Sequence, residues 1–168
     1  MTARFARWSL SAPGAEDVGV CRDRVVALVR RWQEHLDEDC LEAIRLVVSE
    51  VVTNAVVHAA PAAPADSRRT QLTVTVAARS SVVLVVVQDA SEEAPAPRRV
   101  GPDAEGGRGM SLVEALSLDH GWIALAKGKV VWVTLATDVL TAASVPAVPW
   151  PVHEYLPAAA MTALAAAS

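Results

Sequence analysis

The stretch LEAIRLVVSEVVTNAVVHAA, residues 41–60, decides how the rest of the chain is interpreted. Its apolar residues recur at steps of three and four, which predicts a helix with one buried stripe. Glu50, Asn54 and His58 interrupt this apolar sequence at steps of four. Side chains at this spacing lie on one side of a helix, so a carboxylate, an amide and an imidazole come close together.

Asn54 is the most informative of these polar residues. A solvated helix face explains most polar residues on helices, and it is the ordinary explanation for Glu50 alone. Asparagine is a weak helix former, because its side chain competes for backbone hydrogen bonds. Its position in the middle of an apolar helix therefore indicates a partner, such as a ligand or a metal ion.

The composition limits the classes of function. The chain has 168 residues, of which 52% are apolar, and this suits one domain with a full core. A formal net charge of −4 argues against nucleic-acid binding, which needs clustered Lys and Arg. Cys21 and Cys40 are spaced for neither a zinc site nor a redox pair. The sequence shows neither a signal peptide nor an apolar run of the ~20 residues that span a bilayer, so we expect a cytoplasmic protein that does not bind membranes.

The remaining periodicities predict the order of the other elements. Apart from the helix in 41–60, they are a strand over 4–10, a helix over 15–34, strands over 71–78 and 81–88, a helix over 110–118, and strands over 121–126 and 130–136 with a turn at 127–129. This order predicts an α+β fold, a two-layer sandwich with helices on one face of a mostly antiparallel sheet. Residues 1–137 form the predicted domain, and the Pro- and Ala-rich residues 138–168 form a predicted C-terminal tail.

A long segment without apolar periodicity, residues 89–109, carries two further signals. Asp89 follows directly after an apolar strand, a common position for a residue that contacts a ligand. The segment ends in Gly107-Arg108-Gly109, just before the predicted helix. Glycines there leave backbone N–H groups free to bind an anion, although a flexible turn explains such a sequence equally well.

Taken together, these motifs resemble the nucleotide-binding domain of the GHKL ATPases. The N box of that superfamily is similar to Glu50-Val-Val-Thr-Asn54-Ala-Val-Val-His58. The first glycine box is similar to Asp89-Ala-Ser91 with Pro95 following, and the second to Gly107-Arg108-Gly109. The resemblance covers residues 5–136 and implies the Bergerat-type ATP-binding fold. A lone domain of this kind is similar to the bacterial anti-sigma-factor serine kinases of the RsbW-like group.

The resemblance implies roles for individual residues. Asn54 would hold Mg²⁺ through its side-chain oxygen, and Glu50 would be the general base. Asp89 would accept a hydrogen bond from the exocyclic amine of adenine. Further nucleotide-binding residues would be His58, Ser91, Gly107, Arg108, Gly109 and Met110. Residues 90–106 would form a lid over ATP.

Ser91 departs from the family pattern. The first glycine box usually carries glycine two residues after the aspartate, and Ser91 occupies that position here. Glycine permits a close approach of the backbone to a ligand, which serine restricts. The serine at this position is therefore expected to affect how tightly the domain binds ATP.

Several functions fit the resemblance. The first is a serine/threonine protein kinase and anti-sigma factor that uses ATP and Mg²⁺, with a sigma factor and a STAS-domain anti-anti-sigma protein as partners, and with a homodimer as a further possibility. The second is a non-catalytic, ATP-dependent protein-interaction switch. The others are a small accessory ATPase, and an ordinary core helix that binds no nucleotide. Glu50 favours the kinase, because a pure binding domain needs no general base.

Overall fold

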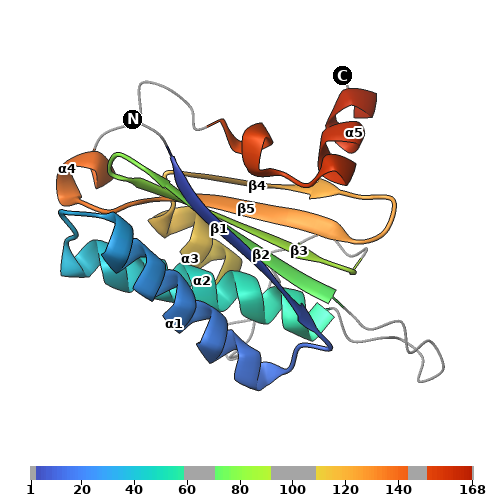
Figure 1. Cartoon of the computed structure of the whole chain (residues 1–168), viewed down its shortest axis with the longest axis horizontal. Coiled ribbons are helices and arrows are strands. Elements are labelled where there is room, and N and C mark those ends of the chain that lie inside the picture. The colour runs from blue at the N-terminus through green and yellow to red at the C-terminus, as the bar shows by residue number, and fades with distance from the viewer. Residues whose placement is uncertain (1–2, 59–70, 92–108, 144–150, 168) are drawn as a thin grey trace.

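A computed structural model describes residues 3–58, 71–91, 109–143 and 151–167, with backbone only for His58 and for residues 163–167. The elements follow the predicted order (Figure 1). They are β1 (Arg4–Ser11), α1 (Ala15–Trp32), α2 (Glu38–His58), β2 (Gln71–Arg79), β3 (Val82–Asp89), α3 (Gly109–Leu116), β4 (Asp119–Ala124), β5 (Lys129–Ala136), α4 (Val139–Ala142), a 3-10 turn η1 (Val152–Tyr155) and α5 (Ala158–Ala167).

The strands form one sheet in the order β1-β2-β3-β5-β4, and every neighbouring pair is antiparallel. Helices α1, α2 and α3 all lie on one face of this sheet (Figure 1). The predicted α+β sandwich is therefore confirmed. None of the helices in the described part of the chain is long and apolar enough to cross a membrane.

The main core lies between the sheet and these helices. Every second residue of the central strands points into it, for example Val83, Val85 and Val87 of β3, which are fully buried. Ile44 and Val48 of α2 are buried against them. β-Branched side chains suit this surface because their stiff rotamers pack well on a pleated sheet.

The boundaries of several elements differ from the prediction by a few residues, and two of the differences have a clear cause. Helix α2 begins at Glu38, and the backbone N–H of Leu41 donates to the carbonyl of Asp37 at 2.9 Å. Strand β5 begins at Lys129, which was predicted to lie in a turn. The inward alternation of β5 extends back to Lys129, whose side chain is buried. The sequence did not indicate this extension of the strand, because lysine is polar and the inward positions that follow it are apolar.

The opposite face of the sheet is covered in part by the residues predicted to form a tail. Figure 1 shows η1 and α5 on the side of the sheet away from α1 and α2. Leu156 and Ala160 are buried there against a second, smaller apolar cluster. Arg7 also donates to the carbonyl of Tyr155 at 2.9 Å. This packing supplies the contacts that a short Ala-rich helix needs in order to form.

Candidate functional site

The acid of the N box lies against the start of α3. Glu50 is half-buried on α2, and a Cβ atom placed on Gly109 would lie 3.1 Å from its Cδ atom and closer still to Oε2. A side chain at position 109 would require the Glu50 carboxylate to move, so glycine leaves room for this carboxylate beside the start of α3. The fold brings together two motifs that are about sixty residues apart in the sequence.

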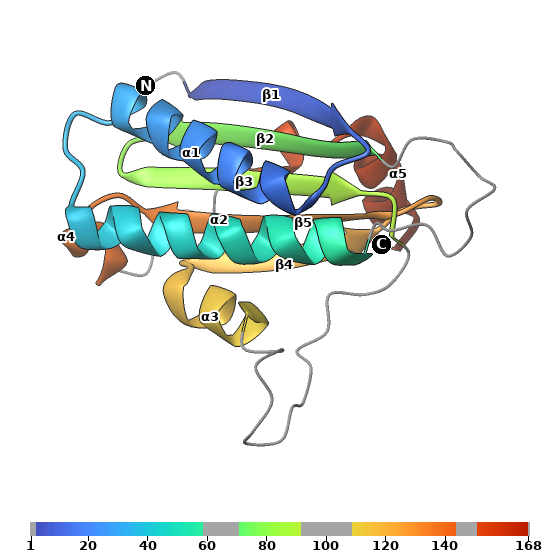
Figure 2. The same cartoon turned by 90° about the horizontal axis from the view of Figure 1, so that it is seen from below.

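Asn54 lies one helical turn beyond Glu50 and is also half-buried. His58 is the last residue of α2, and its side chain lies outside the described residues. Figure 2 shows this end of α2 beside the end of β3, on the side of the sheet that the helices cover. The C-terminal end of α2 and the end of β3 thus lie at the same end of the molecule.

Asp89 is the last residue of β3 and continues the inward alternation of Val85 and Val87. The residue is 2% exposed, so its carboxylate lies within the helix-covered layer and not on the surface. Its Oδ1 atom accepts from the backbone N–H of Ser91 at 2.7 Å and from Nζ of Lys129 at 3.1 Å. A buried carboxylate that is held in this way is fixed in position, as recognition of a ligand requires.

Ser91 occupies the position where the first glycine box usually has glycine. Among the described residues other than glycine, only Ala12 and Ser80 have a positive φ angle. The backbone at Ser91 therefore does not adopt the left-handed conformation that would favour glycine. The Ser91 N–H still closes the turn onto Asp89, so the substitution keeps the turn that presents the carboxylate.

Lys129 is a site residue that the sequence did not predict. It lies opposite Asp89 in the β3–β5 ladder, and its side chain is buried. The preceding Gly128 has a φ of 89°, and a Cβ atom there would overlap the carbonyl of Asp89. The signal in the sequence was the alternation Lys129, Val131, Val133, which places the lysine on the inward face of β5.

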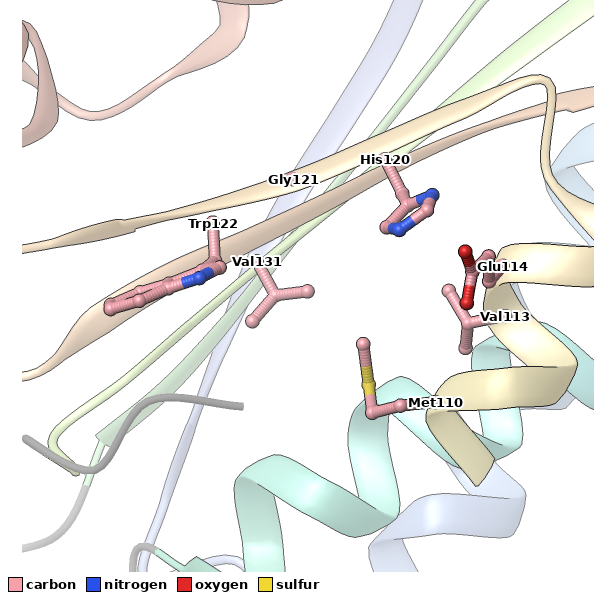
Figure 3. A pocket seen from close by; sticks show the side chains of 7 residues that line it. All are labelled: Met110, Val113, Glu114, His120, Gly121, Trp122 and Val131. Carbon is pink, nitrogen blue, oxygen red and sulfur yellow. The ribbon is translucent and has the colours of Figure 1, made fainter. Parts of the chain in front are cut away.

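A pocket of about 180 Å³ lies between α3 and the strands β4 and β5, and neither Asp89 nor Lys129 lines it. Figure 3 shows His120 and Trp122 on β4 facing Met110 and Glu114 on α3. Met110 is the predicted site residue that lines this pocket. Val131, which also lines it, is the next inward residue after Lys129 on β5.

Other predicted residues lie outside the described part of the chain. These are Gly107, Arg108 and most of the predicted lid, residues 92–106. Where the structure is described, no three or more His, Cys, Asp or Glu side chains are grouped to hold a metal ion. A cation at Asn54 would accordingly need oxygen ligands from a bound phosphate as well, which is how Mg²⁺ is commonly held.

The comparisons with known proteins agree with this geometry. Residues 12–135 match the histidine kinase-like ATPase domain family, which is most of the chain. The protein belongs to the family of histidine kinase-like ATPase domains, and it is an ATP-binding domain of that family.

One solved structure with a similar fold is the histidine kinase domain of the blue-light activated histidine kinase from Erythrobacter litoralis EL346. The two share 18% sequence identity with a TM-score of 0.45, and the alignment covers 73% of this chain and 60% of that chain. No curated protein matches the sequence.

Proposed function

We propose that this protein is a serine/threonine protein kinase and anti-sigma factor, which phosphorylates a STAS-domain anti-anti-sigma protein and binds a sigma factor. The observation that carries the proposal is the position of Glu50 against Gly109. A kinase needs a base beside the phosphates, and the start of a helix is where phosphates bind. The half-buried Glu50 fits this role, which a domain that only binds ATP does not need.

The roles of the other residues follow from their positions. Asp89 would accept from the exocyclic amine of adenine, because its carboxylate is fixed at the end of β3. Asn54 would hold Mg²⁺ together with phosphate oxygens. The cation would offset the charge of the phosphates, which is needed because Glu50 brings a negative charge to the same place.

The proposed reaction is the transfer of the γ-phosphoryl group of ATP to a serine hydroxyl. Glu50 takes the proton from the serine hydroxyl of the partner protein as the oxygen attacks the γ-phosphorus atom. A bond forms between that oxygen and the γ-phosphorus, and the bond from the γ-phosphorus to the β–γ bridging oxygen breaks. ADP leaves with the electron pair of the broken bond, and the phosphate ester remains on the partner.

Calorimetric titration with Mg-ATP tests the binding part of this proposal. We expect micromolar-range binding by the wild type and its loss in Asn54→Ala and in Asp89→Ala. Absence of binding to the folded wild type would overturn the proposal. Thermal unfolding of each variant shows whether a loss of binding is due to a loss of fold.

Transfer of labelled phosphate from ATP to a STAS-domain protein tests the catalytic part. Glu50→Gln should still bind ATP but transfer at least about a hundredfold more slowly, because it lacks a general base. Glu42→Gln, on the exposed side of the same helix, is the matched control and should transfer normally. ATP binding without transfer by the wild type would favour the protein-interaction switch. Phosphate release without an acceptor would favour the accessory ATPase.

A further inference from the structure

The ion pair between Lys129 and Asp89 lies in the place that the proposed function gives to the base of ATP. Both side chains are almost fully buried, with exposed fractions of 2% and 1% for Lys129 and Asp89. A buried ammonium group is costly unless it is paired. The position of this charge therefore calls for an explanation beyond packing.

The geometry of the pair is fixed by the backbone on both sides. Asp89 and Lys129 are direct partners in the antiparallel ladder of β3 and β5. The turn before Lys129 is closed by a hydrogen bond of 2.9 Å from the N–H of Leu125 to the carbonyl of Gly128. Gly128 in turn packs on the backbone of Asp89 and Ala90. The backbone of both residues is therefore held in place at the end of the sheet.

The two groups present a hydrogen-bond acceptor and a donor side by side, with Nζ and Oδ1 3.1 Å apart. An ammonium group has three N–H donors and no acceptor, so Lys129 can donate to Asp89 and to a ligand together. The Watson–Crick edge of adenine carries the complementary pattern, a donor at the exocyclic amine beside an acceptor at N1. The spacing of the pair suits this edge.

We propose that Lys129 is a specificity-determining residue, which donates a hydrogen bond to N1 of adenine while Asp89 accepts one from the exocyclic amine. This inference rests on the proposed function, because it assumes that the base of ATP binds at Asp89. Guanine in the same orientation presents a carbonyl oxygen to the carboxylate and an N–H group to the ammonium. Both contacts are then repulsive, whereas an aspartate alone would oppose only one of them.

Altered nucleotides test the proposal without changing the protein. Calorimetry with the wild-type chain should show that 1-deaza-ATP, which lacks the N1 acceptor, binds about 10- to 100-fold more weakly than ATP. 7-Deaza-ATP keeps N1 and should bind about as well as ATP. Equal binding of ATP and 1-deaza-ATP would overturn the proposal, and so would a loss that appears with 7-deaza-ATP instead.

Variants give the second half of the test. Lys129→Met should weaken the binding of ATP by a factor similar to that for 1-deaza-ATP with the wild type. The variant should bind ATP and 1-deaza-ATP equally well, and it should lose part of the preference for ATP over GTP. Lys127→Met, in the exposed part of the same turn, is the matched control and should behave as the wild type. Asp89→Asn combined with Lys129→Met removes both charges and keeps an acceptor at position 89. The double variant replaces the single variant if the single variant does not fold. It should likewise bind ATP and 1-deaza-ATP equally well.

The outcomes separate this inference from the function on which it rests. If the wild type binds neither ATP nor ADP, the proposed function fails and this inference fails with it. If the wild type binds ATP and Asn54→Ala abolishes binding, but Lys129→Met keeps the selectivity for ATP and the sensitivity to N1, only the role of Lys129 is overturned.

Discussion

The two faces of the sheet are built differently. The face toward α1, α2 and α3 carries a large core of mainly Val, Leu and Ile side chains, with the polar site residues at one end. The other face carries a smaller cluster that includes Leu84, Val86 and Val130 and is covered by η1 and α5. The family match ends at residue 135, so that cover lies beyond it. The helix-covered face therefore carries the candidate site residues, and the C-terminal residues cover part of the apolar surface on the other face.

The comparison also shows where each face tolerates polarity. On the helix-covered face, Lys129 and Asp89 are buried because they neutralise each other. On the other face, Arg7 lies near the edge of the sheet and donates to Thr75 Oγ1 at 2.8 Å. Loss of a partner should accordingly cost far more on the first face than on the second.

The largest effect on stability should come from Lys129→Met. The substitution leaves the Asp89 carboxylate buried without its ammonium counter-ion, and breaking a buried pair in this way costs about 3–5 kcal/mol. Urea unfolding followed by circular dichroism measures the free energy. Asp89→Asn combined with Lys129→Met should recover much of the loss. A single variant as stable as the wild type would mean that the pair is not buried in solution.

Ile44→Ala tests the main core without touching the site. Ile44 is fully buried between α2 and the sheet, so its truncation leaves a cavity among close-packed neighbours. We expect a loss of about 3 kcal/mol in the free energy of unfolding. Leu46→Ala is a suitable control on the same helix because Leu46 is 40% exposed, and its effect should be much smaller.

Leu156→Ala is the corresponding test of the other face. Leu156 is 8% exposed and belongs to the smaller cluster on the other face, so fewer close-packed neighbours surround the space that its truncation leaves. The expected loss is about 1–2 kcal/mol, below the range for closed cores. Measuring Ile44→Ala and Leu156→Ala by the same urea method compares the two faces directly. Equal losses would show that the C-terminal cover is as rigid as the main core.

The sequence predicted the helix layer and the sheet layer because the spacing of apolar residues shows which face of each helix or strand is buried. The alternating valines of β3 and the apolar steps of α2 each identify one buried face. The sequence did not predict that the C-terminal residues cover the second apolar face. These residues are Ala-rich and show little amphipathic pattern of their own.

Among the candidate site residues, the sequence predicted Glu50, Asn54 and Asp89 but not Lys129. The first three are polar residues in apolar surroundings, which makes them conspicuous. Lys129 follows Lys127 and Gly128, so local composition indicated a turn. Its burial is decided by its partner forty residues away on β3, and a local pattern carries no information about such a partner.

The smallest effect should come from Asp138, at the point where the chain leaves β5. Asp138 caps α4 and accepts from the backbone N–H of Thr141 at 2.7 Å. Hydrogen bonds from the Ser81 side chain and from this N–H lower the pKa of the Asp138 carboxyl below its usual 3.8. Near neutral pH, Asp138→Ala should cost about 0.5–1 kcal/mol, at the lower end for caps because the group is exposed to solvent.

The contribution of Asp138 to the free energy of unfolding should depend on pH. Because the folded-state pKa of Asp138 is lower than the unfolded value, the carboxylate stabilises the fold above pH 3.8, and the contribution is lost as the pH falls through the lowered pKa. The difference between the wild type and Asp138→Ala in urea unfolding should therefore shrink on acidification. Asp138→Asn keeps the cap without titrating, so its difference from Asp138→Ala should stay constant. A difference between wild type and Asp138→Ala that persists unchanged in acid would show that the charge of Asp138 contributes nothing where the chain leaves β5.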